Sequence, residues 1–127
     1  MRLGLLTVLL LSACGADETL RAYGARDRDW HLQSIDGTPF AARGTLRFGD
    51  RGALSGEGPC NQLSGKQLAP YPWFQVKELT STRRACPELV AEGQFLAALE
   101  AMTLAEVSGD VLVLSTPEGR EMVFAAK

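Results

Sequence analysis

Residues 87–102 read PELVAEGQFLAALEAM, and the fold class depends on this stretch because only here do apolar residues recur at helical spacing. The residues at i, i+3, i+4 and i+7 of its apolar face are Phe95, Ala98, Leu99 and Met102. Pro87 suits the first helical position, where a missing N–H leaves no bond unmade, and Glu88 suits the positive end of the helix macrodipole. The stretch therefore predicts one amphipathic helix over 87–102.

Short segments on both sides of this helix show the alternation or the β-rich composition of strands. They are 30–35, 45–48, 73–79, 111–114 and 121–124. Turn-forming residues follow three of them, at Asp36-Gly37, 49–52 and 116–119. We expect the last two strands to pair as a hairpin, and the order of elements to be strands, one helix, strands.

The size and charge of the chain limit the classes of protein to which it can belong. Its 127 residues fit one compact domain. Lys plus Arg number 13 against 15 Asp plus Glu, a net charge of -2, so no basic surplus indicates a nucleic-acid partner. Hydrophobic residues make up 46% of the chain, partly because of an apolar leader, and the remainder has the composition of an ordinary soluble globule.

That leader occupies residues 1–13. Arg2 precedes an apolar run over 3–11, which as a helix would rise only about 14 Å and could not cross a hydrocarbon layer of roughly 30 Å. It is therefore predicted to be a removable export signal. Its end, Leu-Ser-Ala-Cys at 11–14, resembles the lipobox of bacterial lipoproteins, which implies cleavage before Cys14 and lipidation of that cysteine. The alternative is a plain secretory leader with an incidental cysteine.

The residues after Cys14 predict a tether and a destination. Gly15, rather than Asp, follows the cysteine, which favours sorting to the outer membrane with the domain facing the periplasm. Residues 14–29 are polar and charged apart from Leu20 and Tyr23, so we expect a tether there, with a flexible reach of roughly 20 Å. The folded domain is expected to span 30–127.

Two further cysteines, Cys60 and Cys86, remain once Cys14 is assigned to lipid. An even pair in an exported chain favours a disulfide. Such a bond would tie the loop before Asn61 to the start of the helix, and the loop-entropy model gives it roughly 3 to 4 kcal/mol.

The sequence around these cysteines resembles the META domain family, which includes the heat-inducible HslJ proteins. Two segments carry the resemblance, Gly-Pro-Cys-Asn-Gln-Leu-Ser-Gly at 58–65 and Thr-Arg-Arg-Ala-Cys-Pro at 82–87, and the similarity extends over 30–124. The family-motif residues outside the cysteines are Asn61, Gly65, Thr82, Arg83 and Pro87. Pro59 and Arg84 depart from the usual pattern, where Gly and Met are common.

The resemblance implies a fold and a broad role. The expected fold is α+β, a curved antiparallel sheet forming a partial barrel with the helix packed against its open side. Family members are exported or lipid-anchored proteins associated with envelope and stress phenotypes, generally without an established enzymatic activity. We therefore expect neither a catalytic site nor a cofactor.

Residues that could carry chemistry have simpler structural interpretations. Cys60 would need a base such as His31 to act as a nucleophile, but Cys86 is the simpler partner. One histidine and two separated cysteines provide no metal-binding motif. The carboxylates of Glu57, Glu78 and Glu88 share no motif that would hold two of them at a catalytic separation, so we expect them on the solvated surface.

Five positions have a predicted structural or binding role. Asn61 is expected to satisfy backbone groups in the turn after Cys60. Arg83 and Arg84 should point to opposite faces, one bracing a buried acceptor and the other meeting solvent or a lipid headgroup. Trp73 and Phe74 should likewise divide between surface and core.

Tyr71 and Trp73 form the first candidate partner surface. We expect a non-enzymatic, outer-membrane-anchored lipoprotein that supports envelope integrity or stress tolerance by binding. Its partner would be a periplasmic protein, a peptide, or an apolar ligand inside the partial barrel. The alternative is a pilot-type lipoprotein that escorts an outer-membrane component. A barrel interior filled by side chains would favour recognition at the surface.

Overall fold

The computed structural model describes residues 16–127. The predicted leader over 1–13 and the predicted lipidation site Cys14 lie outside the described residues. The elements are η1 (Leu20–Tyr23), β1 (Trp30–Ile35), β2 (Thr38–Pro39), β3 (Thr45–Phe48), η2 (Asp50–Gly52), β4 (Ala53–Glu57), β5 (Gln62–Gln67), β6 (Val76–Ser81), α1 (Leu89–Ala101), β7 (Leu104–Ser108), β8 (Val111–Ser115) and β9 (Glu121–Ala126). No helix within 16–127 is long and apolar enough to cross a membrane.

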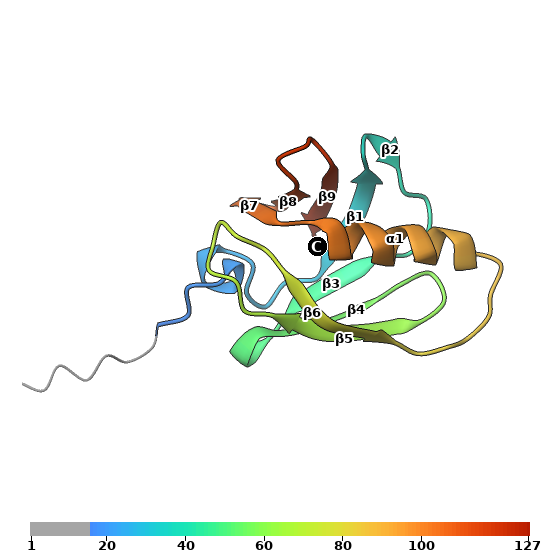
Figure 1. The fold of residues 1–127 in the computed structure, drawn as a ribbon, viewed down its shortest axis with the longest axis horizontal. Coiled ribbons are helices and arrows are strands. Elements are labelled where there is room, and N and C mark those ends of the chain that lie inside the picture. Colours follow the sequence, from blue (N-terminus) through green and yellow to red (C-terminus); the bar gives the residue numbers. More distant parts are fainter. Residues whose placement is uncertain (1–15) are drawn as a thin grey trace, which may run out of the picture.

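The strands form one curled antiparallel sheet in the order β6-β5-β4-β3-β1-β9-β8-β7, with the short β2 paired to β1. The first long strand thus pairs with the last, and the β8–β9 pair confirms the predicted hairpin. Figure 1 shows α1 lying between the β3–β6 part of the sheet and the part that contains β7, β8 and β9. The α+β half-barrel implied by the family resemblance is confirmed.

Main-chain bonds join the two edges of the curled sheet near one end. The amide of Phe74 donates to the carbonyl of Thr103 at 2.9 Å, and the amide of Ala105 donates to the carbonyl of Pro72 at 2.8 Å. The segment before β6 therefore pairs with the start of β7, where Trp73 and Leu104 also form an isolated bridge. This contact brings the two edges of the half-barrel together, while α1 covers the remaining opening.

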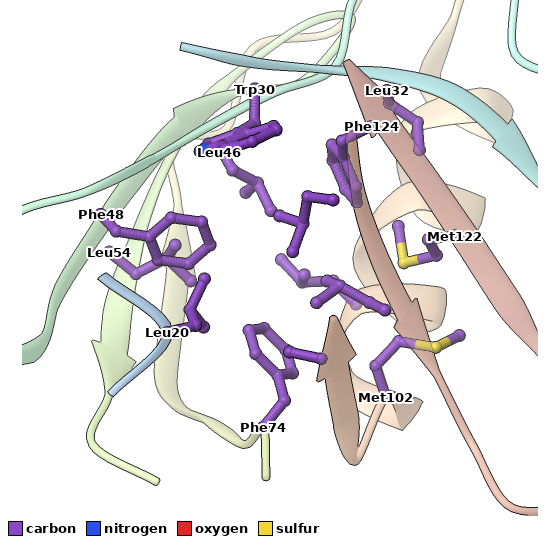
Figure 2. Packing of buried hydrophobic residues seen from close by; sticks show 14 of the residues in the cluster. Leu20, Trp30, Leu32, Leu46, Phe48, Leu54, Phe74, Met102, Met122 and Phe124 are labelled. Atoms are coloured by element: carbon purple, nitrogen blue, oxygen red, sulfur yellow. The ribbon is translucent and has the colours of Figure 1, made fainter. Parts of the chain in front are cut away.

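Large side chains fill the interior between the sheet and the helix. The fully buried ones are Trp30, Phe74, Phe95, Phe124, Leu20, Leu46, Leu54, Leu99, Met102, Leu112, Leu114 and Met122. Figure 2 shows Trp30, Phe48, Phe74 and Phe124 converging on the same core from different segments. Burial of this apolar surface, at about 25 cal/mol per Å², is the main source of stability. Recognition at the surface is therefore favoured over an apolar ligand inside the barrel.

The segment before β1 belongs to the folded domain, so the expected start near Trp30 is too late. Leu20 and Ala25 are fully buried in the core. The carbonyl of Glu18 also accepts a hydrogen bond from the amide of Tyr71 at 2.7 Å. Leu20, Ala25 and this hydrogen bond hold residues 18–25 against the core, so this part of the expected tether over 14–29 is packed rather than free.

The helix and one strand begin later than predicted. Pro87 lies before the N-cap residue Glu88 instead of at the first helical position, because Cys86 and Leu89 first close a turn through a 3.3 Å backbone hydrogen bond. The helix ends one residue before Met102, whose backbone is already extended. The strand expected over 73–79 is found at 76–81, since 72–74 is used in the contact with β7.

Candidate functional site

The predicted disulfide is present between Cys60 and Cys86, whose Cα atoms are 5.7 Å apart. It joins the loop between β4 and β5 to the turn that precedes α1. The Sγ atom of Cys86 also lies 3.3 Å from a carboxylate oxygen of Glu88. Because each sulfur is bonded to the other, neither offers the thiolate that a nucleophile or a metal ligand requires. His31, the base considered for Cys60, lies instead on the outer face of β1.

Asn61 is the centre of the hydrogen-bonded junction beside this disulfide and is only 6% exposed. Its Oδ1 accepts from the amide of Arg84 and, at 2.9 Å, from the hydroxyl of Thr82. Its Nδ2 donates to the carbonyl of Arg84 at 3.0 Å and to Oε2 of Glu92 at 2.6 Å. Asn61 does satisfy backbone groups, but they are the amide and carbonyl of Arg84 rather than groups of the turn after Cys60, and all of its side-chain partners lie 21 to 31 residues along the chain.

Glu92, from the first turn of α1, is a buried carboxylate that sequence reasoning missed. It is 5% exposed and accepts three hydrogen bonds. Its Oε1 accepts from the amides of Cys60 at 3.2 Å and Asn61 at 2.7 Å, while Oε2 accepts from the Asn61 side chain. The available signal was its spacing, since Glu92 precedes the buried Phe95 and Leu99 by three and seven residues on the same helical face.

Gly58 allows the carboxylate of Glu92 to approach the loop. A Cβ atom at this position would lie 2.5 Å from Oε1 of Glu92, closer than any real contact. Even alanine would therefore push the Glu92 carboxylate away from the amides of Cys60 and Asn61, from which Oε1 accepts. Gly58, Asn61 and the disulfide together make the family-motif segments a structural junction between sheet and helix.

The remaining motif residues have smaller roles. Gly65 packs closely beneath β6, and the Thr82 hydroxyl accepts from the amide of Gln62 at 3.1 Å. Pro87 is exposed. Arg83 and Arg84 are both exposed, and neither guanidinium makes a hydrogen bond or an ion pair with residues 16–127. The expectation that one of them braces a buried acceptor is wrong, because the Arg84 main chain makes that contact with Asn61.

A polar groove of about 890 Å³ lies on the outer face of β1, β3, β4, β5 and β6. Two rows of side chains cross these strands in register. The first row is His31, Thr45, Glu57 and Gln62, and the second is Arg47, Ser55, Ser64 and Thr80. They alternate along the strands with buried residues such as Leu46, Leu54 and Leu63, so the same strands supply both the core and the groove.

The groove carries charges of both signs and many hydroxyl groups. Arg47 pairs with Asp29 at 2.8 Å, and Arg43 pairs with Glu57 at 3.0 Å. All four side chains are well exposed, so each ion pair adds little stability. Each charged side chain can therefore leave its partner and bind a ligand instead. Groups that donate and accept hydrogen bonds thus lie side by side over the length of both rows.

The aromatic residues expected at a partner surface lie at the end of the molecule where the two edges of the sheet meet. Trp73 is 56% exposed, while its neighbour Phe74 is 2% exposed, which confirms the predicted division between surface and core. Tyr71 is only partly exposed, because it stacks on Tyr23 at 4.6 Å and its hydroxyl accepts from the amide of Val107 at 3.2 Å. The exposed aromatic pair is therefore Trp73 and Tyr23, supported by Tyr71.

A family model described as the META domain matches residues 23–127. Among solved structures, an NMR structure of a protein from Burkholderia xenovorans is similar with a TM-score of 0.63 at 24% identity, over 81% of this chain and 83% of that one. A second NMR structure has a TM-score of 0.62 at 19% identity, over 82% of this chain and 92% of that one.

A crystal structure of a DUF4847 family protein from Bacteroides vulgatus has a TM-score of 0.56 at 18% identity. The similarity covers 65% of this chain but spans only 57% of the length of that protein. At these identities the structural similarity concerns the fold alone. A search of curated proteins finds no match.

Proposed function

Because this chain belongs to the META domain family, we propose that it is a lipid-anchored, non-enzymatic protein of the bacterial outer membrane that supports envelope integrity or stress tolerance by binding. The leader and Cys14 support the anchor and the export. The observation that carries the binding role is the polar groove on the outer face of the sheet. The interior is filled by core side chains, so the surface is the place for recognition.

The groove chemistry favours an extended polar peptide segment of another envelope protein. A peptide presents alternating donors and acceptors along its backbone, which match rows containing Thr45, Gln62 and Ser64. Side chains of either charge find a counterpart in Arg47 or Glu57 after exchange of the exposed ion pairs. The one large apolar residue lining the groove is Leu63, which is only 4% exposed, so this face offers an apolar ligand no large open apolar side chain.

Ser64→Arg tests the groove, because Ser64 is an exposed residue in the middle of the second row. The added side chain is expected to weaken peptide binding by at least about tenfold, or about 1.4 kcal/mol, with no change in thermal stability. The assay captures peptides from a digest of envelope proteins on the immobilised mature protein and quantifies them by mass spectrometry. The same peptides are then titrated individually by calorimetry.

Ser108→Arg is the matched control, since Ser108 is exposed on β7 outside the groove. It should capture the same peptides as the unaltered protein. If the unaltered protein enriches no peptide, and a deletion strain survives heat and envelope stress like its parent, the binding role is wrong. A stable complex with one outer-membrane component that depends on Cys14 would instead favour the pilot role.

The anchor has its own test in the intact mass of the protein purified from membranes. We expect a chain that begins at Cys14 and carries a diacylglyceryl group and an amide-linked acyl chain, recovered with the outer membrane on a density gradient. Cys14→Ser should leave the leader in place and prevent lipidation. A mature protein cleaved at another residue and found free in the periplasm would contradict the proposal.

A further inference from the structure

The chain is fixed to the folded domain almost from the first described residue. The Glu18 carbonyl accepts from the amide of Tyr71 at 2.7 Å. Arg21 pairs with Asp50 at 2.7 Å and reaches Asp17 at 3.5 Å. Hydrogen bonds from Thr19 to Asp17 order the start of this segment locally. The domain therefore holds its N-terminal segment from Asp17 onward.

Only three Cα–Cα steps separate Cys14 from Asp17, so their Cα atoms are at most about 11 Å apart. The headgroup layer on each side of a bilayer is itself about 5 to 7 Å thick. An acyl chain on Cys14 has to enter the hydrocarbon, which places the cysteine in this layer. The end of the domain that carries Asp17 is then held within about 11 Å of the headgroup layer.

Three large apolar side chains are exposed around this N-terminal attachment, beside charged residues such as Asp50 and Arg51. Leu68 is 60% exposed, Trp73 56% and Tyr23 54%. Leu68 lines the same hollow as Ala16 and Asp17, and Tyr23 stacks on Tyr71, whose amide binds Glu18. The amide of Trp73 donates to the carbonyl of Pro70, which lines that hollow too. Figure 1 shows η1, the β5–β6 connection and the N-terminal end of the described chain together at one end of the molecule.

We propose that Leu68, Trp73 and Tyr23 form a membrane-docking end that rests on the headgroup layer when Cys14 is lipidated. This inference rests on the proposed lipid anchor and adds an orientation to it. Trp and Tyr favour the boundary between water and hydrocarbon, where the ring is in apolar surroundings and the polar atom stays hydrated. A short lipid-anchored linker keeps these side chains at that boundary.

The orientation leaves the proposed binding groove accessible. Glu57 and Gln62 lie at the ends of β4 and β5 that are remote from η2 and from the β5–β6 connection. The segment between β6 and α1, with Arg83 and Arg84, lies at the opposite end of the molecule from the N-terminal segment in Figure 1. The headgroup contact considered for one of these arginines is therefore replaced by a contact through the docking end.

Tryptophan fluorescence of the lipidated full-length mature protein tests this orientation. The chain has two tryptophans: Trp30 is fully buried and Trp73 is exposed, so added quenching reports on Trp73. The protein is reconstituted in phosphatidylethanolamine and phosphatidylglycerol vesicles, with or without lipids brominated near the headgroup end of the acyl chain. We expect the brominated lipids to quench the fluorescence of Trp73 strongly. We also expect the emission maximum of Trp73 to be shifted to shorter wavelength in vesicles, relative to the mature protein without its covalent lipid in buffer.

The matched control places the probe at the other end of the molecule. Val90 is 76% exposed near the start of α1, and Val90→Trp is made together with Trp73→Phe. Quenching at position 90 should be several-fold weaker than at position 73. Equal quenching at both positions, or none at Trp73 in protein of confirmed lipidated mass, overturns the docking end alone. A mass without lipid overturns both the anchor and the docking end.

Discussion

Glu92→Ala is expected to lower the free energy of unfolding by about 3 kcal/mol, because it leaves three buried or partly buried donors without an acceptor. These donors are the amides of Cys60 and Asn61 and one N–H of the Asn61 side chain, whose other N–H still donates to the carbonyl of Arg84. Each belongs to the loop that joins β4 to β5, so the loop should also become more mobile. Urea unfolding followed by circular dichroism measures the loss, and amide hydrogen exchange locates it.

Glu92→Gln keeps the volume of the side chain nearly unchanged and alters only its number of hydrogen-bond acceptors. A carboxylate offers two acceptor oxygens, whereas an amide has one oxygen and one donor group. If the glutamine oxygen takes the place of Oε1, its NH₂ group faces Nδ2 of Asn61, and donor meets donor. Turning the Asn61 amide would break its bonds to Thr82 and Arg84 instead. We therefore expect a loss of about 1 to 2 kcal/mol for this variant.

Glu100→Ala is the control, since Glu100 is exposed on the same helix. It should shift the unfolding midpoint very little. A Glu92→Ala protein as stable as Glu100→Ala would show that water replaces the carboxylate at no cost, and the buried junction would then not be a source of stability.

Removing the disulfide with Cys60→Ala and Cys86→Ala together is expected to cost about 3.5 kcal/mol, from the entropy of the unfolded chain that the bond restricts. The two cysteines are 26 residues apart in sequence. The same value should appear when the unaltered protein is unfolded with and without a reductant. In protein that has not been reduced, neither cysteine should react with an alkylating reagent before or after unfolding.

The two perturbations should not be independent. Glu92 and the disulfide both hold the loop over 58–61 to the segment that enters α1. Once one of these connections is lost, the loop is already more mobile, and losing the other connection costs less. The variant with Glu92→Ala, Cys60→Ala and Cys86→Ala together should therefore lose less stability than the sum of the separate losses. Additive losses would contradict the idea of one shared junction, and two alkylated thiols in native protein would contradict the disulfide itself.

The parts of the fold that could be predicted are those with large apolar residues at regular spacing. The helix was evident from Phe95 and Leu99, and β1, β3, β8 and β9 were found near their observed positions. The strands β4 and β5 were missed because glycine replaces a large side chain on their inner faces. Gly56 is one such position, where a Cβ atom would lie 2.0 Å from the carbonyl oxygen of Thr45. The short β7 was missed because it starts just after the helix.

The candidate sites were less accessible to sequence reasoning, because they depend on contacts between distant segments. The disulfide and Asn61 were found through the motif segments that contain them. Glu92 was missed since an acidic residue in a helix is normally solvated, and only the fold places it under the loop at Gly58. The groove was also missed, because Ser55 and Ser64 become neighbours only through strand pairing.

The pairing of β1 with β9 determines when this chain can fold. This interior pair of the sheet joins residues near 30 to residues near 125, so the sheet cannot be completed until the last strand is available. Such long-range pairing slows folding because the intervening chain has to be ordered first. If the chain is exported as proposed, it is expected to stay unfolded during translocation and to form its core and disulfide only after its C-terminus has crossed the inner membrane.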